Sequence, residues 1–261
     1  MDEAARYNIA RWQALADADA LFTRARLDLT SETAQERVDP EGRLGDLAGK
    51  RVLCLAGGGG QQSAAFALLG ATVTVFDLSE AQLERDRLVT AHYGLPITAV
   101  QGDMRDLSAF DDGAFDIVCQ PYALNFVPNA RAVFAEVARV LVSGGTYNLQ
   151  CANPYATGVT NRDWNGTGYT LRGTYRDGEQ VTYEDQAWVY RRENATNPVP
   201  PPREYRHTLG TILNGLIAAG FALAYLAENE NNYPDPNVEP GSWDHFVSVV
   251  PPWIVFWLHK R

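Results

Sequence analysis

The chain has 261 residues, of which 46% are hydrophobic and 21% are charged, a composition typical of a globular protein that buries a sizeable core. Lysine and arginine total 22 against 32 aspartates and glutamates, and the formal net charge of -10 argues against binding to nucleic acid or to an anionic membrane surface. The longest apolar run, Trp253 to Leu258, is far shorter than the ~20 residues of a membrane-spanning helix, and the N-terminus shows no signal-peptide pattern.

The three cysteines, Cys54, Cys119 and Cys151, all lie in apolar stretches without metal-type spacing. We therefore expect reduced, buried thiols in a cytoplasmic protein. The sequence has no H-E-x-x-H motif, cysteine cluster or calcium loop, so we expect no bound metal.

An amphipathic helical pattern runs through the first residues, and we expect a helical cap of one or two helices at residues 1–47. A continuous apolar run, Val52 to Ala56, follows and ends in four glycines, Gly57 to Gly60. A run that is apolar on both faces is typical of a central parallel strand covered by helices on both sides.

Helical and strand patterns alternate from this point to about residue 152. Ser79 and Gln82 predict a capping box at the start of one of the helices. Strict alternation implies right-handed crossovers, so we expect an α/β fold with a doubly wound, mostly parallel sheet. The predicted helices cover residues 61–69, 79–93 and 130–141, and the predicted strands cover residues 71–76, 97–100, 115–119 and 146–151.

The alternation stops at Asn153, and residues 153–205 form an insertion without a helical period. Asp177-Gly178, between two β-prone arms, predicts a hairpin, so we expect the insertion to be β-rich. Loops after parallel strands build ligand crevices, so we expect a lid over an organic acceptor; an interface between two copies in a homodimer is the alternative. The insertion holds eight aromatic residues: Tyr155, Trp164, Tyr169, Tyr175, Tyr183, Trp188, Tyr190 and Tyr205.

The helical pattern returns over residues 208–219, and strands are predicted over residues 221–227 and 253–259. No helix of convincing length separates these two strands, so we expect them to pair antiparallel. Together the patterns predict a single domain over residues 1–261.

The four glycines predict a cofactor site, because a glycine-rich turn before a helix lets the backbone approach a ligand closely. Asp77 ends the next strand, where a carboxylate can accept hydrogen bonds from both hydroxyls of a ribose. This order of elements indicates a nucleoside cofactor. A dinucleotide site requires the pattern G-x-G-x-x-G, and the run from Gly58 to Ser63 lacks a glycine or alanine at the last position.

The run from Val52 to Gly60 resembles the first motif of the class I S-adenosylmethionine-dependent methyltransferases. The resemblance implies a Rossmann-like, seven-stranded sheet with an antiparallel last strand. It also implies S-adenosyl-L-methionine as cofactor and methyl transfer to a small-molecule acceptor. The resemblance covers about residues 48–152 and 206–261, and the further matching segments are Gly102-Asp103-Met104, Phe115 to Val118 and Leu141 to Gly145.

The resemblance assigns Asp77 to the ribose and the Asp103 segment to the adenine. Cys54 stands where the family often has an acid, and Ala56 where it often has glycine. The contact to the cofactor's ammonium must then come from elsewhere or through water, and Gln61, Gln62, backbone carbonyls of the loop or Gln120 could supply it. The expected cofactor-binding residues are Ala56, Gly57, Gly58, Gly60, Gln61, Gln62, Asp77, Leu78, Asp103, Met104 and Gln120.

Methyl transfer from a sulfonium depends mainly on alignment, and a base is needed only if the acceptor atom carries a proton. His207, just before the helix at 208–219, is the expected base, with Tyr122 as a second catalytic candidate. In the family, residues after the fourth strand face the reacting methyl group. The expected substrate contacts are Tyr122, Asn125, Trp164 and His207. The alternative roles are loop packing for Tyr122 and Asn125, and helix capping for His207.

The sequence therefore predicts S-adenosylmethionine-dependent methyl transfer to a small organic acceptor. Three alternatives remain open: an enzyme of this fold that uses the cofactor for non-methylating chemistry, an NAD(P)-dependent oxidoreductase, and a regulatory subunit that keeps only the fold.

Overall fold

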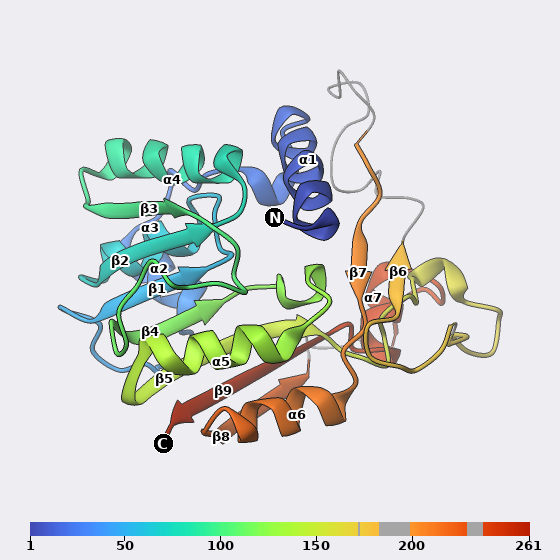
Figure 1. Cartoon of the computed structure of the whole chain (residues 1–261). Coiled ribbons are helices and arrows are strands. Elements are labelled where there is room, and N and C mark those ends of the chain that lie inside the picture. Colours follow the sequence, from blue (N-terminus) through green and yellow to red (C-terminus); the bar gives the residue numbers. More distant parts are fainter. Residues whose placement is uncertain (172, 183–198, 229–236) are drawn as a thin grey trace.

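The computed structural model describes residues 1–171, 173–182, 199–228 and 237–261. A seven-stranded sheet with the order β3-β2-β1-β4-β5-β9-β8 forms the centre of the molecule (Figure 1). The first five strands pair parallel, and β9 pairs antiparallel with both β5 and β8, so the prediction of a doubly wound sheet with an antiparallel last strand is confirmed. The strands are β1 (Arg51–Leu55), β2 (Thr72–Asp77), β3 (Ile97–Gln101), β4 (Phe115–Gln120), β5 (Leu141–Ala152), β8 (Phe221–Glu228) and β9 (Trp253–Lys260).

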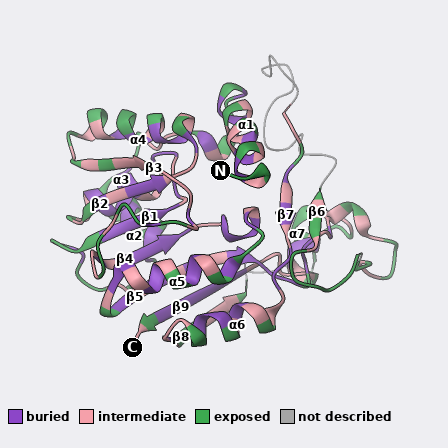
Figure 2. Cartoon of the chain, in the orientation of Figure 1, coloured by how far each residue is buried: buried purple, intermediate pink, exposed green. Residues whose placement is uncertain are grey.

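Helices cover both faces of this sheet. Along β1, Val52 and Cys54 belong to one hydrophobic core, whereas Leu53 and Leu55 belong to the other. The apolar run is therefore buried on both faces, as its composition predicts, and the central strands are mostly buried in Figure 2. One face packs against α2 (Ser31–Val38), α3 (Gln62–Leu68) and α4 (Glu80–Tyr93), and the other against α5 (Ala130–Val140) and α6 (Leu209–Ala218).

The predicted capping box at Ser79 is only half formed. The Ser79 hydroxyl accepts a 3.4 Å hydrogen bond from the Gln82 N–H, as predicted. The Gln82 side chain does not return the contact, because its carboxamide is buried beside the glycine loop.

The predicted hairpin at Asp177-Gly178 is wrong. Strand β6 (Gln180–Thr182) pairs antiparallel with β7 (Arg203–Tyr205), and not with the residues before Asp177. The Asp177 carboxylate instead accepts hydrogen bonds from the Thr208 N–H and the Thr211 hydroxyl at the start of α6. The described part of residues 153–205 is mostly irregular: it has the two short strands β6 and β7, one 3-10 turn, η3 (Asn161–Asp163), and no α-helix. Three aromatic residues of the insertion, Tyr183, Trp188 and Tyr190, lie outside the described residues.

The elements that do not cover a face of the sheet gather at the carboxyl ends of the parallel strands. Helix α1 (Glu3–Asp17), which with η1 (Leu21–Thr23) and α2 belongs to the predicted helical cap, lies there beside β7 (Figure 1). The Asn8 amide donates to the Phe126 carbonyl, and Arg203 of β7 forms an ion pair with Glu3. Helix α7 (Trp243–Val249) precedes β9. A crevice at the point where strand order reverses, between β1 and β4, is the general ligand site of such sheets.

The three cysteines are free and buried, as predicted, and burial raises the pKa of Cys119 to about 12. Within the described ranges, the helices are too short or too polar to pass through a membrane.

Candidate functional site

The glycine loop begins with a residue in a conformation that favours glycine. Ala56 has φ +48°, and its N–H donates to the Phe76 carbonyl at 2.7 Å, so the chain turns sharply as β1 ends. A side chain in the left-handed region is strained by roughly 1–2 kcal/mol. This is the position where the sequence departs from the usual glycine, and the turn is kept in spite of the departure.

Asp77 lies at the carboxyl end of β2, directly beside the loop. Its Oδ2 accepts a 2.9 Å hydrogen bond from the Gly58 N–H, and its Oδ1 accepts one of 2.8 Å from the Ser79 N–H. A Cβ on Gly58 would lie 3.0 Å from the Asp77 carboxyl and 2.7 Å from the Gln82 Cβ, so only glycine fits there. Burial raises the pKa of Asp77, although these backbone hydrogen bonds oppose the shift.

A second carboxylate, that of Asp86 on α4, binds the backbone of the glycine loop. It accepts hydrogen bonds from the Gly59 N–H at 3.0 Å, the Gly60 N–H at 3.1 Å and the Ser63 hydroxyl at 2.5 Å, and it is fully buried. Burial, partly offset by these bonds, raises its pKa to about 6. Sequence reasoning missed Asp86; the available signal was a pair of polar residues, Gln82 and Asp86, on the buried face that Leu83 and Val89 also share.

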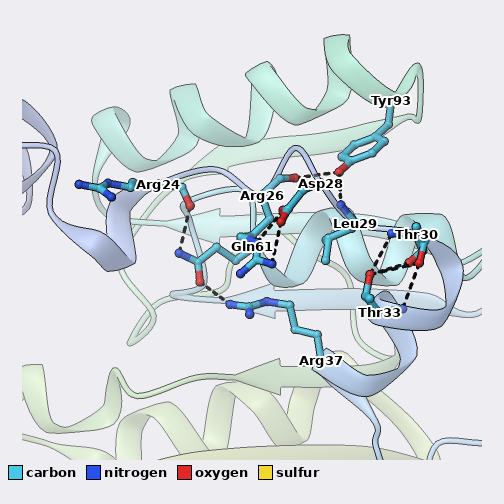
Figure 3. A network of polar contacts seen from close by, with 9 residues as sticks. All are labelled: Arg24, Arg26, Asp28, Leu29, Thr30, Thr33, Arg37, Gln61 and Tyr93. Atoms are coloured by element: carbon cyan, nitrogen blue, oxygen red, sulfur yellow. Dashed lines mark hydrogen bonds and ion pairs between the residues drawn. The ribbon is translucent and has the colours of Figure 1, made fainter.

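Of the candidate cofactor residues in this loop, Gln61 is turned away from the strands. Its carboxamide donates to the carbonyls of Phe22 and Arg24 and accepts from the Arg37 guanidinium (Figure 3). Only the backbone of Gln61 remains for a ligand, while Gln62 opens α3 and is partly exposed.

Asp103 follows β3 and is tied to the N-terminal helix. Arg105 donates to the Asp103 carboxylate at 2.9 Å and, through its terminal nitrogens, to Asp2 at 2.6 Å. The Gly102 N–H donates to the Asp77 carbonyl, so the residues that follow β3 lie next to the end of β2. The structure thus brings the candidate ribose and adenine acids to adjacent strand ends.

Two other cofactor candidates, Gln120 and Met104, contact each other in the core. The Gln120 amide donates to the Met104 sulfur at 3.3 Å, and its oxygen accepts from the Tyr147 hydroxyl. Gln120 is fully buried, so its side chain is committed to the core and only its backbone is left for a cofactor. The backbone carbonyl of Leu78, another cofactor candidate, accepts a hydrogen bond from the Gln101 side chain.

The segment after β4 contacts strand β7 of the insertion. The Tyr122 hydroxyl donates to Glu204 Oε2 at 2.8 Å, and Glu204 of β7 is 5% exposed. Asn125 Oδ1 accepts from the Ala152 N–H at 3.0 Å, whereas its buried Nδ2 has no partner among the described residues. Glu204 was not predicted, because its contact exists only after β7 has folded against this segment.

His207 lies behind the same segment. Its Nε2 is 3.3 Å from the Leu124 carbonyl oxygen, and the residue is 5% exposed. Burial lowers the pKa of His207 despite its backbone hydrogen bonds, so the ring is neutral at pH 7.

Trp164, the remaining substrate candidate, belongs to a different cluster. Its ring packs edge-on against His245 of α7 at 4.6 Å between centroids, and also contacts Tyr169. Tyr122 and Asn125 belong to the segment after β4, and His207 contacts that segment at Leu124. None of the contacts described above joins Trp164 to it.

Known proteins resemble this chain in sequence and structure. Residues 53–149 match a family described as a methyltransferase domain. A Bacillus subtilis protein described as the uncharacterized methyltransferase YbaJ is 34% identical over 191 residues, which are 72% of this chain and 71% of that protein. A ubiquinone biosynthesis O-methyltransferase from Cronobacter sakazakii is 28% identical over 201 residues, covering 74% of this chain and 79% of that protein. The structure of an S-adenosylmethionine-dependent methyltransferase from Mesorhizobium loti has a TM-score of 0.60 at 20% identity, covering 90% of this chain and 100% of that one.

Proposed function

The chain belongs to the class I S-adenosylmethionine-dependent methyltransferases, and on that premise we propose that its methyl acceptor is a small organic molecule held between the segment after β4 and strand β7. The observation that carries the proposal is the partly buried hydrogen bond between Tyr122 and Glu204, which joins the segment after β4 to strand β7 of the insertion. The Cronobacter relative, by its name, acts in ubiquinone biosynthesis, which supports an acceptor of low molecular weight. The net charge of -10 disfavours a nucleic acid.

The residues of the glycine loop fit a nucleoside with no phosphate. Gly59 and Gly60 direct their N–H groups at Asp86, and Gly58 directs its own at Asp77. A dinucleotide pyrophosphate needs such N–H groups for itself. The loop therefore supports S-adenosylmethionine and speaks against NAD.

We assign the cofactor's parts to the residues that the strand ends bring together. Asp77 would accept hydrogen bonds from the ribose, and Asp103 with the backbone of Met104 would take the adenine. Backbone atoms of Ala56, Gly57, Gly60, Gln61, Leu78 and Gln120, with the side chain of Gln62, would line the rest of the site.

S-adenosylmethionine supplies an electrophilic methyl group on a sulfonium. The chain must align the acceptor with that group, and such alignment is worth roughly 7–11 kcal/mol of the barrier. Where the acceptor atom carries a proton, the Tyr122 oxygen can accept a hydrogen bond from it while the Tyr122 hydroxyl donates to Glu204, and a neutral His207 can take the proton as methyl transfer proceeds. Asn125 Nδ2, buried and unpartnered among the described residues, is a donor for a polar group of the acceptor.

Two measurements test the proposal. Thermal-shift titrations with S-adenosylhomocysteine and with NAD, in parallel, should show stabilisation by S-adenosylhomocysteine alone. A screen of small phenols, carboxylic acids and amines with isotopically labelled methyl donor should then give a labelled product. Stabilisation by NAD alone would indicate an oxidoreductase, and no response to either would indicate a subunit that keeps only the fold. Labelling confined to macromolecules would contradict the proposed acceptor class.

A further inference from the structure

Gln82 carries a buried carboxamide that the folded chain leaves unsatisfied. The residue is 2% exposed, and neither its Oε1 nor its Nε2 has a hydrogen-bond partner among the residues that the structure describes. Buried polar groups are almost always paired, because an unpaired one loses its hydration without compensation. Both ends of one carboxamide being unpaired points to a partner that is supplied from outside the chain.

The surroundings of Gln82 place this carboxamide at the cofactor loop. A Cβ on Gly58 would lie 2.7 Å from the Gln82 Cβ and 3.0 Å from the carboxyl of Asp77, so all three groups meet at one point. A Cβ on Gly59 would lie 3.0 Å from Gln82 Oε1. The carboxamide therefore extends from α4 along the loop, next to the carboxylate that we assign to the ribose.

We propose that the carboxamide of Gln82 forms a hydrogen bond with a ribose hydroxyl of the cofactor. This inference rests on the proposed assignment of Asp77 to the ribose. A hydroxyl both donates and accepts, and a carboxamide offers one acceptor and two donors, so the two groups are complementary. Asp77, as a carboxylate, can only accept from the ribose, whereas Gln82 can also donate to it.

The chain offers a matched control for the loss of this side chain. Gln35, on α2 in the same half of the molecule, donates its Nε2 to the Asp39 carbonyl at 2.6 Å. The leucine side chain has one heavy atom fewer than that of glutamine, is somewhat bulkier, and has no polar atoms. Gln82→Leu removes an unpaired carboxamide, and Gln35→Leu removes a paired one.

The test measures affinity by calorimetry for S-adenosylhomocysteine and for 5′-methylthioadenosine, which has the ribose and thioether but no amino-acid part. Gln82→Leu should weaken both by about tenfold. The melting temperature of the ligand-free variant should equal or exceed that of the wild type, because an unpaired buried group is removed. Gln35→Leu should leave both affinities unchanged and should lower the melting temperature.

Unchanged affinities in a folded Gln82→Leu protein would overturn the inference. A loss confined to S-adenosylhomocysteine would place the contact at the amino-acid end, and would overturn the assignment to the ribose. If the leucine variant does not fold, Gln82→Met serves the same comparison with a more flexible side chain. The wild type is measured first: its failure to bind either ligand would refute the proposed cofactor site, and this inference with it.

Discussion

The Tyr122 hydroxyl donates a 2.8 Å hydrogen bond to Glu204 Oε2, which joins the segment after β4 to a strand of the insertion. Tyr122→Phe removes this bond and the phenolic oxygen while keeping the ring. Because the lost bond is to a charged group, turnover should fall on the order of 10- to 100-fold. Affinity for S-adenosylhomocysteine should stay within about twofold of the wild-type value.

Kinetics on Tyr122→Phe, Glu204→Gln and the double variant check this prediction. If the two residues act as a unit, the double variant should be no slower than the worse single one. Tyr225→Phe, a change on the exposed side of β8, is the control and should leave turnover unchanged. Wild-type turnover in Tyr122→Phe would mean that the tyrosine only packs the loop.

If Asp77 binds the ribose as we propose, Asp77→Ala should weaken cofactor binding at least tenfold, because it removes charge-assisted hydrogen bonds of ~1.5–3 kcal/mol each. Asp103→Ala should have a smaller effect, because in the proposed site only the adenine amino group loses a partner, and the ion pair between Arg105 and Asp2 remains. Calorimetric titration with S-adenosylhomocysteine measures both. Wild-type affinity in a folded Asp77→Ala protein, as judged by circular dichroism, would refute the ribose assignment.

His207→Ala tests whether the imidazole is a base. If the acceptor is a hydroxyl or a protonated amine, turnover should fall by about 10²–10⁴-fold while S-adenosylhomocysteine binds normally. The pKa of His207 is lowered by burial, so activity that depends on the neutral ring should persist below pH ~6.5. Turnover within about threefold of wild type would show that the ring only holds the residues between β7 and α6 against the Leu124 carbonyl.

Asp86→Asn tests the anchor behind the glycine loop. An amide cannot accept hydrogen bonds on both sides, so the Gly59 and Gly60 N–H groups lose an acceptor and cofactor affinity should fall about tenfold. Asp39→Asn is the matched control, because Asp39 is also fully buried and accepts the N–H groups of Arg43 and Leu44. Equal effects of the two changes on affinity would mean that Asp86 acts on stability alone.

The raised pKa of Asp86 also fixes the sign of a pH dependence. The folded state holds a proton on this residue up to pH about 6, whereas an ordinary aspartate has lost it above 3.8. Between these values the folded state binds more protons, so the contribution of Asp86 to the free energy of unfolding rises as the pH falls. We expect urea unfolding of the wild type and of Asp86→Asn at pH 7, 6 and 5 to show that the free energy of unfolding of the wild type increases relative to that of the variant as the pH falls. A relative decrease as the pH falls would contradict the raised pKa of Asp86.

Ala56→Gly should stabilise the fold. The left-handed φ of +48° costs alanine roughly 1–2 kcal/mol, and the extra freedom of glycine in the unfolded chain returns about 0.4–1 kcal/mol of this. A net gain of about 0.5–1 kcal/mol is expected in the free energy of unfolding by urea, with unchanged secondary structure. A loss of stability would show that the methyl group of Ala56 contributes more packing than the strain costs.

The sheet was predictable because its pattern is local: both faces of β1 are apolar, so helices on both sides follow. The positions of the glycine loop after β1 and of Asp77 at the end of β2 were predictable for the same reason. The pairing of β6 with β7 was not, because the two strands are distant in sequence and Asp177, the supposed turn residue, caps α6 instead.

The polar contacts of the site depend on tertiary structure in the same way. The spacing of Asp86 with Leu83 and Val89 indicates that this acid lies on the buried face of α4, but it does not show that Gly59 is the partner. Nothing near Glu204 in the sequence shows that Tyr122 will reach it. Gln61 and Gln120 were assigned to the cofactor by position along the chain, yet their side chains found partners in the cap and in the core.

Strand β9 joins β8 to the rest of the sheet, and this has a consequence for how the protein is made. Thr146 of β5 pairs with His259 of β9, which lies 113 positions further along the chain, and among the described residues β8 has no other neighbour in the sheet. A nascent chain on the ribosome therefore exposes the open edge of β5 and an unpaired β8 until residues 253–260 emerge. Open strand edges recruit other strands, so a message truncated before Trp253 should yield protein that aggregates and is degraded.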